Sequence, residues 1–454
     1  MGLQAPSIAA IALLLLLGCS PSARVDDPPR EEVVFWHFWG GEDRPVVDGI
    51  VLRFNESQDR YRVRAIAMPG NNLDLKFFLG VAGGDPPDLV NQDDPILADW
   101  ASRGALTPLD ELVDADELAA LSQWLFPVAR QLSSYDDRLY ALPNGLDIRA
   151  LYYNATWLEE LGIDPPATID ELDRLAEAVA PRGGGALKQV GYLPDPRRLW
   201  AWGVVFGGGF WNPEAATPDE AITLDCAENL AALKWMAAYR DRYGADRMAS
   251  FRTGDQALTG SSFPLLAGRR YAAIMDGQWR VRDLAKAAAE TPSQGERQDR
   301  YSVAPLPTPP GGRSDAGWVN GNFFLVPRGA RQADGAWEFM KFWSGFNGNE
   351  TGAAEACVAG GWMPVSQRVV DEPVFQAMLT RRPLFGEFVR LAASPNQQPT
   401  PPLPVASFYY REVNAAVQDV LYRGADAEQR LREAAERVRD QLRPVWERER
   451  EAAR

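Results

Sequence analysis

The sequence predicts an α/β fold built on a largely parallel sheet. Its 454 residues are enough for two or three domains, since a domain averages about 150 residues. Between residues 33 and 90, short apolar runs alternate with stretches whose apolar residues recur at helical spacing. This strand-helix-strand-helix-strand order is typical of parallel sheets, because parallel neighbours need a crossover between them.

The first three strands end in sequences that favour ligand binding. Ligands of open α/β sheets bind beyond the carboxyl ends of the strands. Here HFWGG (37–41) follows the first strand and NQDD (91–94) follows the third. The strands are expected at 33–38, 61–68 and 87–90, with helices at 44–57 and 73–82 between them.

The rest of the chain continues to alternate. Thr168 followed by Glu171 is a capping-box pattern, which predicts that a helix begins there. In the tail, Leu431, Ala435 and Val438 recur at helical spacing and predict an amphipathic helix. Further strands are expected within 140–154, 271–277, 301–306 and 318–327, and further helices at 155–162, 168–180, 225–242, 281–290, 333–346 and 426–443.

The N-terminus has the pattern of an export signal. Residues 7–18 are almost entirely apolar, too short to span a bilayer and of the right length for a signal-peptide core. They run into LLGC (16–19), which resembles a bacterial lipobox and predicts a lipid on Cys19. Myristoylation of Gly2 is the weaker alternative, and the absence of Lys and Arg before residue 7 departs from the usual signal pattern. We therefore expect a signal peptide at 1–18, a flexible polar tether at 19–32, and an exported protein anchored by lipid to the bacterial membrane, in the periplasm or at the cell surface.

Composition argues against several classes of function. The net charge of −15 argues against nucleic acid as a partner. A single histidine and scattered cysteines predict neither a metal site nor a cofactor. GGDPPD (83–88) lacks the Lys-Ser/Thr of a phosphate-binding loop. Cys226 and Cys357 can be a disulfide or two buried thiols, and the sequence leaves both possibilities open.

Eight stretches together resemble a known family. They include FWHFWG, LGVAGGDPPDLV, AAIMDGQW, YSVAPLPTPPGG and GWMPVSQ. They stand in the order and spacing of the family 1 extracellular solute-binding proteins of ABC importers, the maltose-binding-like group. The resemblance implies a type II periplasmic-binding-protein fold, with two lobes, a hinge of chain crossings near 144–150, 302 and 345, and a ligand cleft between the lobes. It assigns 33–145 plus 303–345 to an N-lobe and 146–302 plus 346–454 to a C-lobe.

The same resemblance implies capture of a carbohydrate by lobe closure. The bound protein would deliver the sugar to two permease subunits that work with an ATP-binding cassette subunit. A polyamine, iron or a glycerol-phosphate-type ligand stays open as an alternative, as does a surface sensor or adhesin without transport. We expect no enzymatic activity, because the sequence shows neither a pair of glycosidase carboxylates nor a serine- or cysteine-histidine arrangement.

The candidate ligand contacts are aromatic, carboxylate and amide side chains near the expected strand ends. Aromatic rings cover the apolar faces of sugars, while polar groups bind their hydroxyls. Trp36 is expected in the core, and His37 is more consistent with a structural role than with ligand contact. The candidates are Trp39, Glu42, Asp93, Asp94, Asn144, Asp147, Trp211, Trp279, Trp318, Asn320, Trp362 and Tyr409, with Asp276 and Tyr410 as weaker ones.

Overall fold

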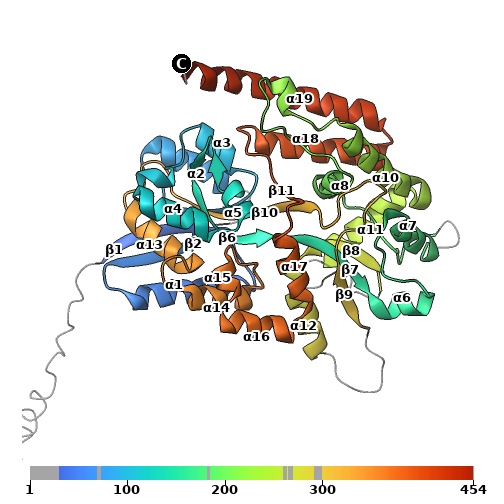
Figure 1. The fold of residues 1–454 in the computed structure, drawn as a ribbon, viewed down its shortest axis with the longest axis horizontal. Helices are drawn as coiled ribbons and strands as arrows, with labels where there is room; N and C mark the ends of the chain where they lie inside the picture. The colour runs from blue at the N-terminus through green and yellow to red at the C-terminus, as the bar shows by residue number, and fades with distance from the viewer. Residues whose placement is uncertain are drawn as a thin grey trace, which may run out of the picture.

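The computed structural model describes residues 30–68, 73–180, 185–258, 263, 269–290 and 299–452. Two sheets divide this part of the chain into two lobes, which lie side by side in Figure 1. We call the lobe with the larger sheet the N-lobe and the other the C-lobe. The expected signal peptide and Cys19 lie outside the described residues.

The N-lobe starts with the predicted succession of strands and helices. β1 lies between β2 and β3 and is parallel to both. Their bounds are close to those predicted: β1 (Glu31–His37), α1 (Arg44–Ser57), β2 (Tyr61–Ala67), α2 (Leu73–Gly83) and β3 (Leu89–Asp93).

Strand β10 (Gly317–Leu325) makes the larger sheet mixed rather than largely parallel. It runs antiparallel to β3 and to β6 (Ala141–Asp147), and parallel to β11 (Gln397–Pro399). The carboxyl ends of β3 and β6 therefore meet the middle of β10, at Asn322 and Asn320.

The C-lobe sheet has three antiparallel strands. β7 (Arg149–Asn154) lies between β8 (Ala273–Gly277) and β9 (Tyr301–Ala304). The expected parallel pairing is therefore confirmed only in the N-lobe, because the long excursions between the C-lobe strands bring each neighbour back in the opposite direction.

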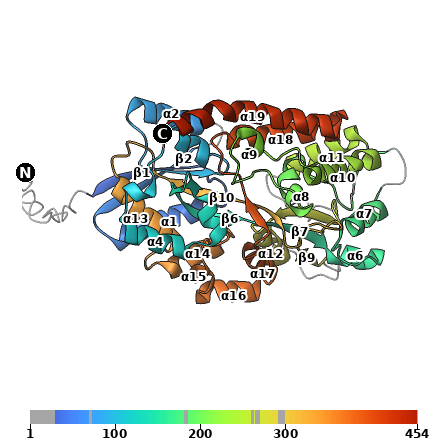
Figure 2. The same ribbon diagram turned by 45° about the horizontal axis from the view of Figure 1, so that its top comes forward.

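Helices surround both sheets. The capping box at Thr168 is present, and the predicted tail helix buries Leu431, Ala435 and Val438. Figure 2 shows α18 and α19 lying together along one side of the molecule. The other elements are α3 (Leu97–Ser102), α4 (Ala115–Trp124), α5 (Pro127–Leu132), β4 (Ser134–Tyr135), β5 (Arg138–Leu139), α6 (Ala155–Leu161), α7 (Ile169–Ala178), α8 (Leu199–Val205), α9 (Pro218–Ala221), α10 (Ala227–Tyr243), α11 (Ala245–Leu258), α12 (Arg280–Glu290), α13 (Ala333–Ser344), α14 (Glu350–Gly360), α15 (Gln367–Val370), α16 (Pro373–Arg381), α17 (Leu384–Ala392), α18 (Ala406–Gln418) and α19 (Ala427–Ala452), with single turns η2 (Leu109–Glu111), η3 (Pro196–Arg198) and η4 (Asp419–Arg423).

The chain passes between the lobes at several points. The first crossing runs from β6 to β7 through Ile148, and the second runs from β9 to β10. At the first crossing the buried side chain of Gln278 accepts a hydrogen bond from the Ile148 N–H (3.0 Å) and donates one to the Leu146 carbonyl (2.8 Å). A C-lobe side chain therefore holds the backbone of the hinge.

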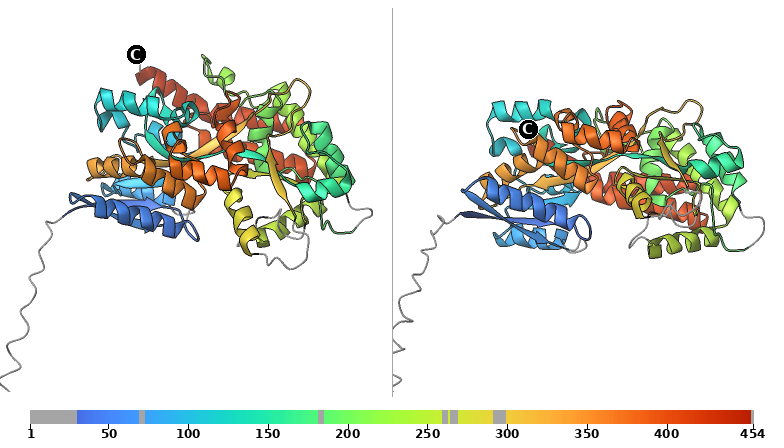
Figure 3. Two further views of the ribbon diagram at one scale, coloured as in Figure 1. Left: turned by 60° about the horizontal axis from the view of Figure 1, so that its bottom comes forward. Right: turned by 90° about the horizontal axis from the view of Figure 1, so that it is seen from below.

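The third crossing lies later in the chain than expected. α14 packs against α1 and α13 of the N-lobe, whereas α17 packs against β9 of the C-lobe. The crossing thus falls between residues 361 and 383, not near 345 as predicted. Gly345 ends α13 in a left-handed conformation, and the chain continues into α14 on the same lobe. Figure 3 shows this orange segment reaching from the blue N-terminal elements toward the C-lobe.

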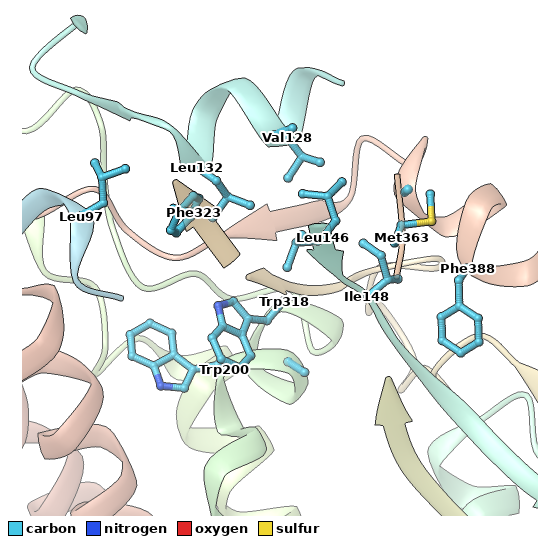
Figure 4. Packing of buried hydrophobic residues seen from close by; sticks show 14 of the residues in the cluster. Leu97, Val128, Leu132, Leu146, Ile148, Trp200, Trp318, Phe323, Met363 and Phe388 are labelled. Carbon is cyan, nitrogen blue, oxygen red and sulfur yellow. The ribbon is translucent and has the colours of Figure 1, made fainter. Parts of the chain in front are cut away.

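A continuous apolar core runs through both lobes. Figure 4 shows Trp200 close to Trp318, near the crossing strands that carry Leu146 and Ile148. Among the described helices, none is long and apolar enough to cross a membrane.

Candidate functional site

Three strands bring the acidic candidates together. Asp93 and Asp147 end β3 and β6, and β10 places Asn322 opposite Asp93 and Asn320 opposite Asp147. Asp93 is exposed, and Asp94 and Asp147 are half-buried. The antiparallel direction of β10 is the reason why residues more than two hundred positions apart meet at one point.

Arg149, which the sequence analysis missed, lies in the middle of this cluster. It is the second residue after Asp147 and is only 5% exposed. Its guanidinium lies 4.9 Å from the ring centre of Trp318 and 5.4 Å from that of Trp279. It donates hydrogen bonds to the Asp147 carbonyl (2.8 Å) and to the Asn320 side chain. A cation between two tryptophans is a strong contact when solvent is excluded.

The signal for Arg149 was present in the sequence. A charged residue directly after the first crossing, ahead of the apolar run ALYY, is unusual for the start of a buried strand. Its ring partners could not be found this way, because Trp279 and Trp318 come from different lobes.

Desolvation, together with the mutual repulsion of the carboxylates, raises their pKa values. Although part of the Asp93 side chain reaches solvent, the surrounding protein desolvates its carboxyl; this and, to a smaller extent, the charges of Asp147 and Asp94 raise its pKa to about 8 against the opposing charge of Arg149. Burial also raises the pKa of Asp94 to about 7, although a hydrogen bond from Thr400 acts in the other direction. The pKa of Asp147 is raised mainly by burial. Burial and the neighbouring Arg198 lower the pKa of Arg149 to about 10. Near neutral pH the cluster therefore holds both donors and acceptors of hydrogen bonds.

Trp318 forms a buried wall of the cluster instead of an open ring. It is 3% exposed, packs near Trp200 and Tyr410, and its indole N–H donates to Thr400 (2.9 Å). Thr400 in turn donates to Asp94. This chain of contacts connects the strand that follows the third crossing to the acidic cluster.

A cavity of about 680 Å³ opens beside the cluster in the C-lobe. Trp279 and Asp276, both candidates from the sequence, line it together with Arg197 and Arg198. Asp276 is paired with Arg280 (2.8 Å), and Asp195 with Arg197 (2.8 Å). Arg198 makes no ion pair with any described residue, and its Nε lacks a hydrogen-bond partner. Trp279 lines the cavity and also lies against Arg149, so the cavity adjoins the acidic cluster.

Of the two tryptophans of β1 and its following loop, Trp39 is the more deeply buried, the reverse of the prediction, and Trp36 packs against the core from a half-buried position. Trp36 is half-buried, whereas Trp39 is only 5% exposed. Trp39 stacks on Trp343 of α13 (5.3 Å between ring centres) and packs against Trp362. The covered face of β1 is the one with Phe35, because α13 packs on that side. Trp39 is thus a core residue in this structure, not an open ligand contact.

His37 lies on the same covered face as Trp39. It is 1% exposed, and burial lowers its pKa to about 4. The structural interpretation of His37 agrees with this position.

Glu42 and its neighbour make ion pairs between the lobes. Glu42 pairs with Lys286 of α12 (2.5 Å), and Asp43 pairs with Arg282 of the same helix (2.8 Å). Arg282 also donates to the Gly360 carbonyl (2.9 Å). We therefore find Glu42 at the rim, bound to the protein itself.

The other candidates lie in different surroundings. Asn144 is buried and accepts a hydrogen bond from Asn91 (2.8 Å). Trp362 is half-buried at the edge of the Trp39–Trp343 stack. Tyr409 is fully buried and donates to the Phe210 carbonyl (2.8 Å), while its neighbour Tyr410 is half-buried near Arg149. Trp211 lines a separate cavity.

The two cysteines are not bonded to each other, and no metal-binding group is found among the described residues. Cys226 and Cys357 are free thiols, and burial raises the pKa of Cys357 to about 12. Within the described ranges, no group of three or more His, Cys, Asp or Glu is placed to hold a metal ion.

Comparison with known proteins identifies the family. The sequence model of the bacterial extracellular solute-binding proteins matches residues 49–381. This chain belongs to that family. It is 22% identical to the galactooligosaccharide-binding protein of Bacillus subtilis (strain 168) over 447 residues, or 96% of each chain. It is 29% identical over 155 residues to the alpha-glucosides-binding periplasmic protein AglE of Rhizobium meliloti (strain 1021), a match that spans 32% of that protein.

A solved structure shares the two-lobed fold of this solute-binding protein. The structure described as CpMnBP1 with mannotriose bound has a TM-score of 0.74 and 23% identity, and covers 90% of this chain and 100% of its own. The predicted family and fold class are confirmed.

Proposed function

We propose that this solute-binding protein captures a carbohydrate in the cleft formed by the acidic cluster and the C-lobe cavity. The observation that carries the proposal is Arg149, buried between Trp279 and Trp318 beside Asp147. Aromatic surface next to closely placed carboxylate, amide and guanidinium groups suits the apolar faces and hydroxyl rims of sugars. Relatives and structural neighbours with oligosaccharide ligands support the same class.

In this proposal the two lobes supply different groups. Asp93 and Asp94 of the N-lobe would bind sugar hydroxyls, as acceptors or as protonated donors. Trp279 of the C-lobe would cover a ring face, and Arg198 would donate to a hydroxyl oxygen. Ligand that contacts both walls binds the closed form more tightly than the open form and shifts the population toward closure.

Delivery to a membrane importer follows from this role. We propose that the closed protein is recognised by two permease subunits with an ATP-binding cassette subunit, and that a lipid on Cys19 keeps the protein near them. The protein acts as a binder, without a catalytic step.

Arg198 favours one alternative ligand class. A guanidinium with no ion pair to any described residue, lining a cavity, can also bind the phosphate of a glycerol-phosphate-type ligand. The crowded carboxylates of Asp93, Asp94 and Asp147 oppose a full negative charge, so the neutral sugar is the preferred ligand.

A thermal-shift screen followed by calorimetry tests the proposal. The panel contains malto-, manno- and galacto-oligosaccharides, glycerol 3-phosphate and spermidine, tested on the protein and on its Trp279→Ala variant. We expect at least one oligosaccharide to raise Tm, and Trp279→Ala to lower its affinity by tenfold or more. Stabilisation by glycerol 3-phosphate or spermidine alone would reject the sugar.

A further inference from the structure

A second cavity lies between the lobes, away from the acidic cluster. Its volume is about 720 Å³, within the usual range for small-molecule sites. The N-lobe contributes residues of α4, α5 and the β4–β5 turn, and the C-lobe contributes Trp211 and Trp446 of α19. The segment from Pro399 to Pro404 forms its third wall.

One strand end separates this cavity from the proposed sugar cleft. Pro399, the last residue of β11, lines the second cavity. Thr400, the next residue, donates to Asp94 of the acidic cluster. Consecutive residues thus belong to two different sites.

The two tryptophans of the second cavity differ from most others in the chain. Trp39, Trp343 and Trp362 stack together, and Trp200 packs near Trp318. Trp211 and Trp446 are half-buried, and neither contacts another aromatic ring or a cation in the part of the chain that the structure describes. The Trp446 indole N–H also lacks a hydrogen-bond partner there. Neither ring is therefore held in place by the polar or aromatic contacts that fix the other tryptophans.

The charged side chains around these rings also lack ion-pair partners among the described residues. Arg130, Asp136 and Asp137 are exposed and make no ion pair with described residues, although the chain forms many such pairs elsewhere. Both aspartates have positive φ, of 48° and 58°. This left-handed pair makes the tight β4–β5 turn that brings them to the cavity. The lining thus offers aromatic faces together with hydrogen-bond donors and acceptors.

We propose that this second cavity binds a saccharide ring of its own, at a site separate from the cleft. The Trp211 and Trp446 rings would cover its apolar faces, and Arg130, Asp136 and Asp137 would bind its hydroxyls. The choice of a saccharide rests on the proposed function, but the cavity shares none of its named residues with the cleft. Because its walls come from both lobes, an occupant with different affinity for the open and closed forms would also change the affinity of the cleft.

Calorimetry on separated sites tests this inference. The full chain is titrated with maltose, mannobiose and galactobiose to millimolar concentrations, as are the variants Trp279→Ala, Trp446→Ala and Arg448→Ala. Arg448 is exposed on the same helix as Trp446 and does not line the second cavity. We expect a second, weaker binding event that survives in Trp279→Ala and Arg448→Ala and is weakened tenfold or more in Trp446→Ala.

The outcomes separate this inference from the proposed function. Binding with one site only, lost in Trp279→Ala and unaffected in Trp446→Ala, overturns the second site and leaves the cleft intact. If the Trp279→Ala variant binds none of the saccharides at millimolar concentration, the second site is likewise overturned. Saccharide binding that depends on Trp446 alone supports the second site and rejects the cleft proposal. Trp446→Phe tests whether the indole N–H contributes to saccharide binding, because phenylalanine keeps an aromatic face and removes the donor.

Discussion

Trp39 shows how one residue can have the wrong role in a correct fold. A tryptophan before two glycines at a strand end has the pattern of an exposed ligand contact. The ring instead stacks on Trp343, which lies 304 positions later in the chain (343 − 39). Strand alternation left the phase of β1 undecided, because apolar residues occupy both faces. The packing of α13, which the sequence does not reveal, decides which face is covered.

Substitution of Trp39 by alanine tests this assignment. Removal of a buried tryptophan leaves a cavity, and we expect a loss of about 3–5 kcal/mol in the free energy of unfolding. Urea denaturation of the unliganded protein measures it. Trp36→Ala, at the half-buried position, is the matched control and is expected to cost less. A sharp fall in ligand affinity with unchanged stability would restore Trp39 as a ligand contact.

At the scale of elements, α12 of the C-lobe forms two ion pairs with the loop after β1. Arg282 and Lys286 lie one helical turn apart on α12 and pair with the adjacent residues Asp43 and Glu42. The two pairs differ in exposure: the side chains of Arg282 and Asp43 are 22% and 31% exposed, against 53% and 63% for Lys286 and Glu42. Solvent weakens the second pair more than the first.

Alanine substitutions on α12 separate the two pairs. We expect Lys286→Ala to change the free energy of unfolding by less than about 1 kcal/mol. Arg282→Ala is expected to cost more, about 1–3 kcal/mol, because it also leaves the Gly360 carbonyl without its donor. Urea denaturation of both variants measures the difference. Equal effects would mean that the charge on α12, and not burial, governs this contact.

The sequence predicted elements better than contacts. The alternation from β1 to β3, the capping box of α7 and the tail helix α19 follow from local patterns and are confirmed. Asp93 and Asp94 became candidates because they follow the third predicted strand, and Asp147 because it flanks the first crossing, whereas Asn320, expected near a strand end, lies inside β10. Arg149 was missed because its role depends on two rings from different lobes, and the partner of Glu42 lies on a helix far along the chain.

At the scale of the whole molecule, folding concentrates carboxylates from separate strands at one place. The pKa values of Asp93 and Asp94 are raised in the folded protein, so the folded state binds more protons than the unfolded state between their two titration ranges. Stability from these groups is therefore complete at low pH and is lost as pH rises from about 4 toward 8. His37 acts in the opposite direction, because its lowered pKa makes the folded state less stable as pH falls from about 6.5 toward 4.

Comparison of the protein with Asp93→Asn isolates the acidic cluster. The variant cannot ionise at this position, so it should gain stability relative to the unmodified protein as pH rises from 4 to 8. Urea denaturation at a series of pH values, without ligand, gives the difference in the free energy of unfolding between the two proteins. The contribution of His37 is present in both and cancels in this difference. A flat difference across this range would show that the pKa of Asp93 is not raised in the folded state.

The hydrogen bonds of Gln278 have a consequence for how binding is communicated. Gln278 holds the hinge backbone on both sides of Asp147, and the next residue, Trp279, lines the proposed sugar cleft. Trp279, which would contact the ligand, and Gln278, whose side-chain amide holds the hinge, are thus adjacent residues joined by one peptide bond. A displacement of Trp279 on ligand binding would act on Gln278, and through its two hydrogen bonds on the hinge backbone.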